Sequence, residues 1–229
     1  YPYSEQNPAD FLQKSSAEHL FGTDQYGRDI FSRVLYGARI SLSVGFIAVG
    51  VALVSGGLLG AIAGFYGGRV DNVIMRCMDI LLSIPSVLLA LAIEAAFGTS
   101  VINLMIATGI STVPSYARLV RSSILSIKDQ EFVEAARAVG TSDAVIITQH
   151  ILPNCLAPIL VQATFGVATA ILTVAGLSFV GLGLQPPIPE WGSMLSDART
   201  YIRDYAYMMV PPAVAIALTV FCLNARGDG

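Results

Sequence analysis

The residues able to do chemistry in this chain are few, and their spacing fits no catalytic site. Asp79 and Glu94 are the only acids near the interior of the long apolar runs. If one helix carries both, a rise of 1.5 Å per residue separates them by ~22 Å, which is too far for two carboxyls to share a proton. We expect each to be an interfacial carboxylate or one paired with a partner, rather than part of a proton relay.

The motifs of nucleotide and peptide-bond hydrolysis are also absent. A phosphate-binding loop ends in Gly-Lys-Ser/Thr, yet neither Lys14 nor Lys128 follows a glycine. Residues 176–180, GLSFV, lack the last glycine of a nucleophile elbow, and His19 and His150 lie too far apart for a His-Glu-x-x-His zinc site. We therefore predict no catalytic residue, no cofactor and no metal ligand in this chain, which is not an enzyme. If ATP drives its work, a partner binds the ATP.

The elements that hold these residues are predicted to be membrane helices. Hydrophobic residues make up 54% of the chain and charged residues only 13%, against roughly 25% in a soluble domain. A membrane helix needs ~20 mostly apolar residues, and four charge-free gaps reach that length. They lie between residues 39 and 69, 94 and 118, 143 and 190, and 204 and 226. The net charge of −3, without a basic cluster, argues against nucleic acid as a partner.

Five spans are predicted, in a lipid bilayer, and residues 1–39 lie outside them. The polar residues 1–39 end in an amphipathic helix over residues 30–39. The spans are expected at about residues 40–66, 77–97, 101–117, 155–184 and 206–225.

The longest polar interval between apolar runs, residues 129–153, has the pattern of a helical hairpin. Apolar residues from Phe132 to Val139 recur at helical spacing, and Gly140 stands where a helix favours a left-handed residue. Residues 141–143 offer N-caps for a second helix, and Pro153 is expected to end it. Four basic residues between positions 118 and 137 favour a cytoplasmic location.

The same hairpin can be interpreted as a plain loop or as a docking element, and the pattern favours docking. A plain loop needs neither an alanine pair nor a glycine stop. In a docking element, Ala135 and Ala136 keep one face thin enough to enter a groove, Glu134 offers a charge, and Gly140 permits the turn.

Residues 134–136 (EAA), Gly140 and residues 151–153 (ILP) resemble the EAA loop of permease subunits in binding-protein-dependent ABC importers. His150 occupies a position where that loop usually has isoleucine, and the local form HILPN is similar to the dipeptide, oligopeptide and nickel branch. The stretches LFGTDQYGRDIFSRVLYGARISLSVG and LSFVGLGLQPPIPEWGSML resemble the second, or C-type, permease of that branch.

The resemblance implies an all-α polytopic membrane bundle with a cytoplasmic EAA coupling hairpin. It implies six spans, with one missing ahead of Tyr1, a periplasmic segment at residues 1–39 and a transmembrane domain at residues 40–229. The implied location is the bacterial or archaeal cytoplasmic (inner) membrane. By the same resemblance, the residues that dock on the ATPase are Phe132, Glu134, Ala135, Ala136, Ala138, Gly140, Ile151 and Pro153.

The implied partners are a homologous second permease, two cytoplasmic ABC ATPases and a periplasmic or lipid-anchored solute-binding protein. ATP and Mg²⁺ would be bound by the ATPases alone. The implied function is to form the pathway for dipeptides or oligopeptides. A nickel-chelate importer is the alternative, and a secondary carrier outside the ABC class is a more distant one.

Overall fold

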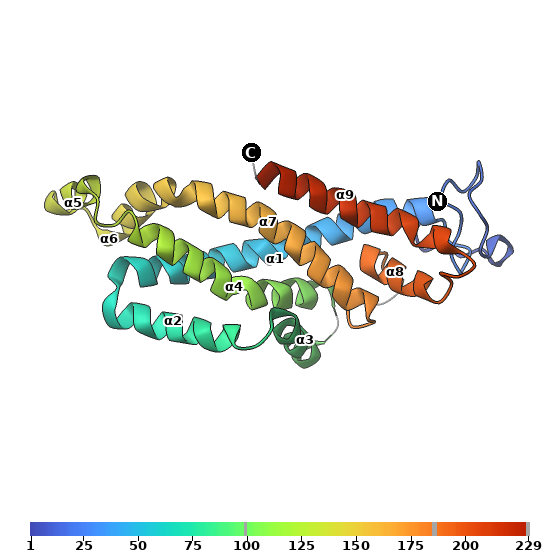
Figure 1. Cartoon of the computed structure of the whole chain (residues 1–229), viewed down its shortest axis with the longest axis horizontal. Helices are drawn as coiled ribbons and strands as arrows, with labels where there is room; N and C mark the ends of the chain where they lie inside the picture. The colour runs from blue at the N-terminus through green and yellow to red at the C-terminus, as the bar shows by residue number, and fades with distance from the viewer. Residues whose placement is uncertain (99, 185–186, 228–229) are drawn as a thin grey trace.

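The computed structural model describes residues 1–98, 100–184 and 187–227, and these residues form an elongated bundle of helices. Figure 1 shows α5 and α6 at one end of the long axis, with the N-terminal segment and α8 at the other. The predicted all-α architecture is confirmed. In chain order the helices are α1 (Ile30–Tyr66), α2 (Gly68–Leu82), α3 (Ser86–Phe97), α4 (Val101–Leu125), α5 (Glu131–Ala138), α6 (Asp143–Val145), α7 (Leu152–Phe179), α8 (Trp191–Arg199) and α9 (Val210–Gly227), with short 3-10 turns at Pro8–Asp10 and Ala206–Met208 and a π-helical turn at Ile146–Ile151.

The first helix is longer than predicted, because it joins the expected amphipathic helix and the first span. Asp29 caps it by accepting a hydrogen bond from the Ser32 backbone N–H at 2.7 Å, and no proline interrupts it before Tyr66. Gly67, at φ +65°, ends it in a conformation that favours glycine. The prediction of two separate elements, at residues 30–39 and 40–66, was therefore wrong.

Helices α1 and α4 run in parallel and touch backbone to backbone. A Cβ added at Gly56 would lie 2.6 Å from the Val113 carbonyl oxygen, and one at Gly60 would overlap the Ala117 carbonyl oxygen. Small residues four positions apart let membrane helices pack this closely. The contact fixes α4, and with it the start of the hairpin, against the longest apolar helix of the bundle.

The second predicted span, residues 77–97, is broken. Helices α2 and α3 meet at an angle of 87° across residues 83–85. Pro85 accounts for the break, because a proline disfavours helical geometry in the residue before it. The helix before the break also starts earlier than predicted, at Gly68 directly after Gly67.

The other predicted spans are helices with different bounds. Helix α4 continues to Leu125 and contains Pro114, instead of ending near residue 117. The fourth and fifth spans correspond to α7 and α9. Among the described residues, three helices are long and apolar enough to cross a membrane: Ile30–Tyr66, Asp143–Phe179 and Ala206–Gly227. The bent α2–α3 pair passes the same test only as a unit.

A helical hairpin and a central pocket

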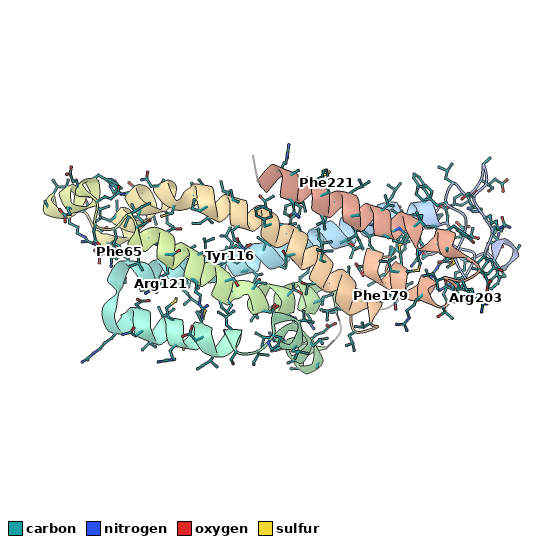
Figure 2. The ribbon with its side chains drawn as sticks, viewed as in Figure 1. Phe65, Tyr116, Arg121, Phe179, Arg203 and Phe221 are labelled. Atoms are coloured by element: carbon teal, nitrogen blue, oxygen red, sulfur yellow. The ribbon has the colours of Figure 1, made fainter. Side chains whose placement is uncertain are left out.

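Helix α5 is held to the end of the bundle by two inward side chains. Val133 is fully buried and Ala136 is 8% exposed, and both belong to a core cluster with Phe65, Ile124 and Ile146. The Arg137 guanidinium stacks over the Phe65 ring at 5.2 Å, which adds a cation–π contact. The helix is therefore fixed to α1, α4 and the second arm of the hairpin, near Phe65 in Figure 2.

The turn of the hairpin is the glycine-terminated one that the sequence predicts. Gly140 has φ +80°, its N–H donates to the Arg137 carbonyl at 3.0 Å, and the Thr141 N–H donates to the Ala136 carbonyl at 3.1 Å. This pair of hydrogen bonds is the Schellman arrangement, which requires a left-handed residue at the glycine position. The next helix, α6, starts at Asp143, and the side chain of its N-cap residue Ser142 makes no capping bond.

The second arm of the hairpin does not end at Pro153, so that prediction was wrong. The chain runs as one helix from Asp143 to Phe179, through the π-helical turn and then α7. Pro153 occupies the first turn after the π segment, where a missing N–H is tolerated. His150 lies in the π turn, half-buried, and its carbonyl accepts a hydrogen bond from the Asn154 side chain at 2.7 Å.

The predicted docking residues divide between the inside and the outside of the hairpin. Ala136 and Ile151 face the chain's own core, and Ile151 is fully buried, so they support the hairpin from within. The alanine pair therefore does not share one outward face. The outward residues are Phe132, Glu134, Ala135, Ala138, Gly140 and Pro153, joined by Val139, which is 81% exposed.

Two ion pairs connect α2 to α4. The Arg121 guanidinium binds Asp71 through two bonds of 2.5 and 2.6 Å, and Arg118 binds Asp79 at 2.5 Å. Asp79 is therefore paired, which is one of the two alternatives expected for it. The Asp71–Arg121 pair was missed, because sequence does not show which faces of two helices meet. Glu94 is 2% exposed, and among the described residues its carboxylate oxygens have no hydrogen-bond partner.

A pocket of about 290 Å³ lies in the middle of the bundle, between α1, the α2–α3 break, α4 and α7. Its polar lining comes from Ser86, Ser111, Thr112, Ser115, Tyr116, Gln162 and Thr169. Tyr116, which is labelled in Figure 2, lies near the middle of the long axis of the bundle. Its hydroxyl donates a hydrogen bond to the Gln162 carbonyl at 3.2 Å. None of the described residues that line it carries a charge.

The opposite end of the molecule contains a buried network of charges that sequence reasoning also missed. Arg28 and Arg33 are each 2% exposed; Arg28 binds Asp24 at 2.5 Å, and Arg33 lies 3.6 Å from the same carboxylate. His19 Nδ1 lies 2.9 Å from Asp29 Oδ1. Burial would raise the pKa of Asp29, but hydrogen bonds from Ser32 and His19 lower it overall. The nearest signal in the sequence was the turn pattern of residues 22–29.

Comparison with known proteins identifies the family. The family model described as "Binding-protein-dependent transport system inner membrane component" matches residues 56–228. The chain belongs to this family. It is accordingly a permease subunit of a binding-protein-dependent importer, and it is embedded in a membrane. Homologues with this role match nearly the whole length of the chain.

Among the relatives of this permease is the dipeptide transport system permease protein DppC of Alkalihalophilus pseudofirmus, which is 53% identical over 99% of this chain and 75% of its own length. The di/tripeptide permease DppC of Pseudomonas aeruginosa is 44% identical over 97% of this chain and 73% of its own. The glutathione permease GsiD of Escherichia coli O6:K15:H31 is 46% identical over all of this chain and 76% of its own.

Solved structures show the same fold at low sequence identity. An inward-facing form of the MetNI methionine ABC transporter superposes with a TM-score of 0.70 at 20% identity, over 87% of this chain and 94% of that chain. An amino acid ABC transporter with histidines gives a TM-score of 0.60 at 17% identity, over 86% and 90%. The helical bundle is thus the ABC importer permease fold.

Proposed function

We propose that this permease carries short peptides across the inner membrane, and that its hairpin couples their passage to ATP hydrolysis by two cytoplasmic ATPases. In the complete importer it pairs with a homologous permease and receives peptide from a solute-binding protein outside the membrane. The chain contributes the pathway and the coupling surface, and ATP and Mg²⁺ are bound by the ATPases.

The observation that carries the coupling proposal is the outward face of α5. Phe132 is 39% exposed and Val139 is 81% exposed, at the tip of the molecule, while Val133 and Ala136 secure the same helix from beneath. Small residues at Ala135 and Ala138 leave room for a groove to close around the helix, and Glu134 offers it a charge. An apolar face of this kind, held on a rigid support, fits the helix-in-groove mode of binding.

Peptide as the substrate class is supported by the relatives. The three described above carry names for dipeptide, di/tripeptide and glutathione transport, at 44–53% identity. All three names denote short peptides or a tripeptide-like molecule, so they agree on the chemistry of the cargo.

The coupling proposal is tested in proteoliposomes that contain the complete importer. Glu134→Lys reverses the charge on the exposed face, and Ser122→Lys adds the same charge at an exposed site on α4 outside the hairpin. We expect Glu134→Lys to reduce peptide-stimulated ATP hydrolysis at least ~10-fold, equivalent to ~1.4 kcal/mol, and Ser122→Lys to leave it near the wild-type rate. Equal hydrolysis in both variants would contradict the docking role of α5.

The substrate proposal has a separate measurement. Uptake of a radiolabelled dipeptide, a tripeptide and a nickel–histidine chelate is compared in the wild-type importer with its own binding protein. We expect the peptides to accumulate and to compete with each other. Accumulation of the chelate without peptide uptake would replace the peptide proposal with a metal-chelate importer.

A further inference from the structure

The central pocket is suited to bind a peptide main chain. Four of its hydroxyl groups donate to backbone carbonyls of the bundle, which leaves their oxygens as acceptors for the amide N–H groups of a peptide. The Gln162 side-chain amide and the Ser115 hydroxyl supply uncharged donors for the carbonyl groups of the peptide. A wall without fixed charge neither attracts nor repels particular side chains, so it accepts peptides of varied sequence. At about 290 Å³ within one subunit, it is close to the lower end of ligand pockets, roughly 300 Å³.

An accessible ion pair lies one helical turn from this lining. Asp79 is three residues before Leu82, and Arg118 is three residues after Ser115; Leu82 and Ser115 both line the pocket. Residues three apart share a helix face, so the Asp79–Arg118 pair borders the pocket on the faces of α2 and α4 that line it. Their side chains are 46% and 51% exposed.

The two ion pairs between α2 and α4 differ in how easily they open. Asp71 is 13% exposed and holds Arg121 through two bonds, so this pair fixes the helices together. The Asp79–Arg118 pair has one bond between two half-exposed groups, and such pairs contribute little to stability. Asp79 and Arg118 can therefore break their mutual ion pair and bind the charged groups of a ligand instead, at a small cost in free energy.

We infer that the pocket and the Asp79–Arg118 pair together form a binding site for a short zwitterionic peptide. The hydroxyl and amide groups hydrogen-bond the peptide's main chain. Arg118 binds its terminal carboxylate, and Asp79 binds its terminal ammonium group. This inference rests on the proposed function, because it names the site at which this subunit binds the transported peptide.

Occupancy of the pocket is tested by filling it. Ser115 is exposed toward the pocket, so Ser115→Trp obstructs the space without adding volume to the core. Ile106→Trp is the matched control: it lies on the same helix, 40% exposed, nine residues away and thus about half a turn around the axis. We expect Ser115→Trp to reduce dipeptide uptake at least ~10-fold and Ile106→Trp to change it less than ~2-fold.

The role of the ion pair is tested by terminal selectivity, which a merely structural contact would not affect. The ratio of uptake of a free dipeptide to its C-terminal amide is measured for the wild type, for Arg118→Gln and for the exposed α2 control Arg76→Gln. We expect Arg118→Gln to reduce that ratio at least ~10-fold and Arg76→Gln to preserve it. Asp79→Asn is expected to do the same for the ratio of the free to the N-acetylated dipeptide.

The outcomes separate the two proposals. If the wild-type importer takes up no peptide, the proposed function fails and the binding site fails with it. If the wild type imports peptide and Ser115→Trp imports it equally well, the pocket is off the pathway and only the site is overturned. If Arg118→Gln lowers uptake of the free and amidated peptides by the same factor, the ion pair is a structural link and the assignment of peptide termini is overturned.

Discussion

At the scale of single residues, Asp29 and Glu94 show two opposite environments for a carboxyl group in this permease. Asp29 makes two kinds of contact at once, capping α1 through Ser32 and lying 2.9 Å from His19. Glu94 is the opposite case, since it is buried at 2% exposure with no partner among the described residues. A buried carboxyl group without a partner is costly in a medium of low polarity, so Glu94 does not stabilise the chain as Asp29 does.

Asp29→Ala should destabilise the end of the molecule opposite the hairpin, because it removes the cap of α1. We expect a loss of about 1 kcal/mol in the free energy of unfolding at pH 7, measured by denaturant titration in detergent. The pKa of folded Asp29 lies below its usual 3.8, so its stabilising contribution is complete above that value and is lost as the pH falls through the folded pKa. The difference between wild type and variant should therefore shrink below about pH 4.

The exposed Asp204, whose side chain makes no hydrogen bond or ion pair within the described part of the chain, provides the control as Asp204→Ala. It should leave the free energy of unfolding within ~0.5 kcal/mol of wild type. A difference for Asp29→Ala that persists unchanged down to pH 3 would show that the cap acts without its charge.

At the scale of helices, the close approach of α1 and α4 is the contact most sensitive to side-chain size. Gly60 lies against the Ala117 carbonyl, whereas the neighbouring Gly57 has no atom within 4 Å of an added Cβ. The two positions have the same residue type on the same helix and differ only in the face on which they lie.

Gly60→Leu should separate α1 from α4, because its side chain has no space at the backbone contact. We expect a loss of about 1–3 kcal/mol in the free energy of unfolding, with reduced assembly of the complete importer. Gly57→Leu should stay within ~0.5 kcal/mol of wild type. Equal destabilisation by both variants would mean that helix propensity or the lipid contact, rather than the packing against α4, determines the effect.

Sequence reasoning located the helices well and their faces poorly. Long charge-free runs identify membrane helices because apolar length is a direct requirement of the bilayer. The same reasoning predicted one span over residues 77–97, which is bent by 87° at residues 83–85. It also separated residues 30–39 from the first span, although one helix covers both. It placed Ala136 and Ile151 on a docking surface, although both are buried. Helical spacing gives the angle between two side chains around the helix axis. Only the tertiary contacts decide which of those side chains face the core of the bundle.

At the scale of the whole molecule, the hairpin and the buried charge network lie at opposite ends of the bundle (Figure 1). Arg203, labelled in Figure 2, is exposed at the end that holds α8, and Gln149 is exposed on the second arm of the hairpin. A permease that spans the membrane along its long axis presents these residues to different aqueous compartments.

A labelling experiment in intact cells tests this orientation. Arg203→Cys should react with a membrane-impermeant maleimide added outside, whereas Gln149→Cys should react only after the cells are permeabilised. The unaltered chain, which has cysteines at positions 77, 155 and 222, gives the background. Labelling of Gln149→Cys in intact cells would place the hairpin on the outer side and contradict its proposed contact with cytoplasmic ATPases.

The unbroken helix from Asp143 to Phe179 has a mechanical consequence. One end belongs to the hairpin, and Gln162 and Thr169 further along line the central pocket. At 1.5 Å per residue, Asp143 and Gln162 are ~28 Å apart along this rod, so a tilt of roughly 10° about one of them displaces the other by ~5 Å. Ile146 and Ile151, both fully buried, clamp the π-helical turn between them. If the proposed ATPases push on the hairpin, a helix of this length would convert that small displacement into a change in the width of the pocket.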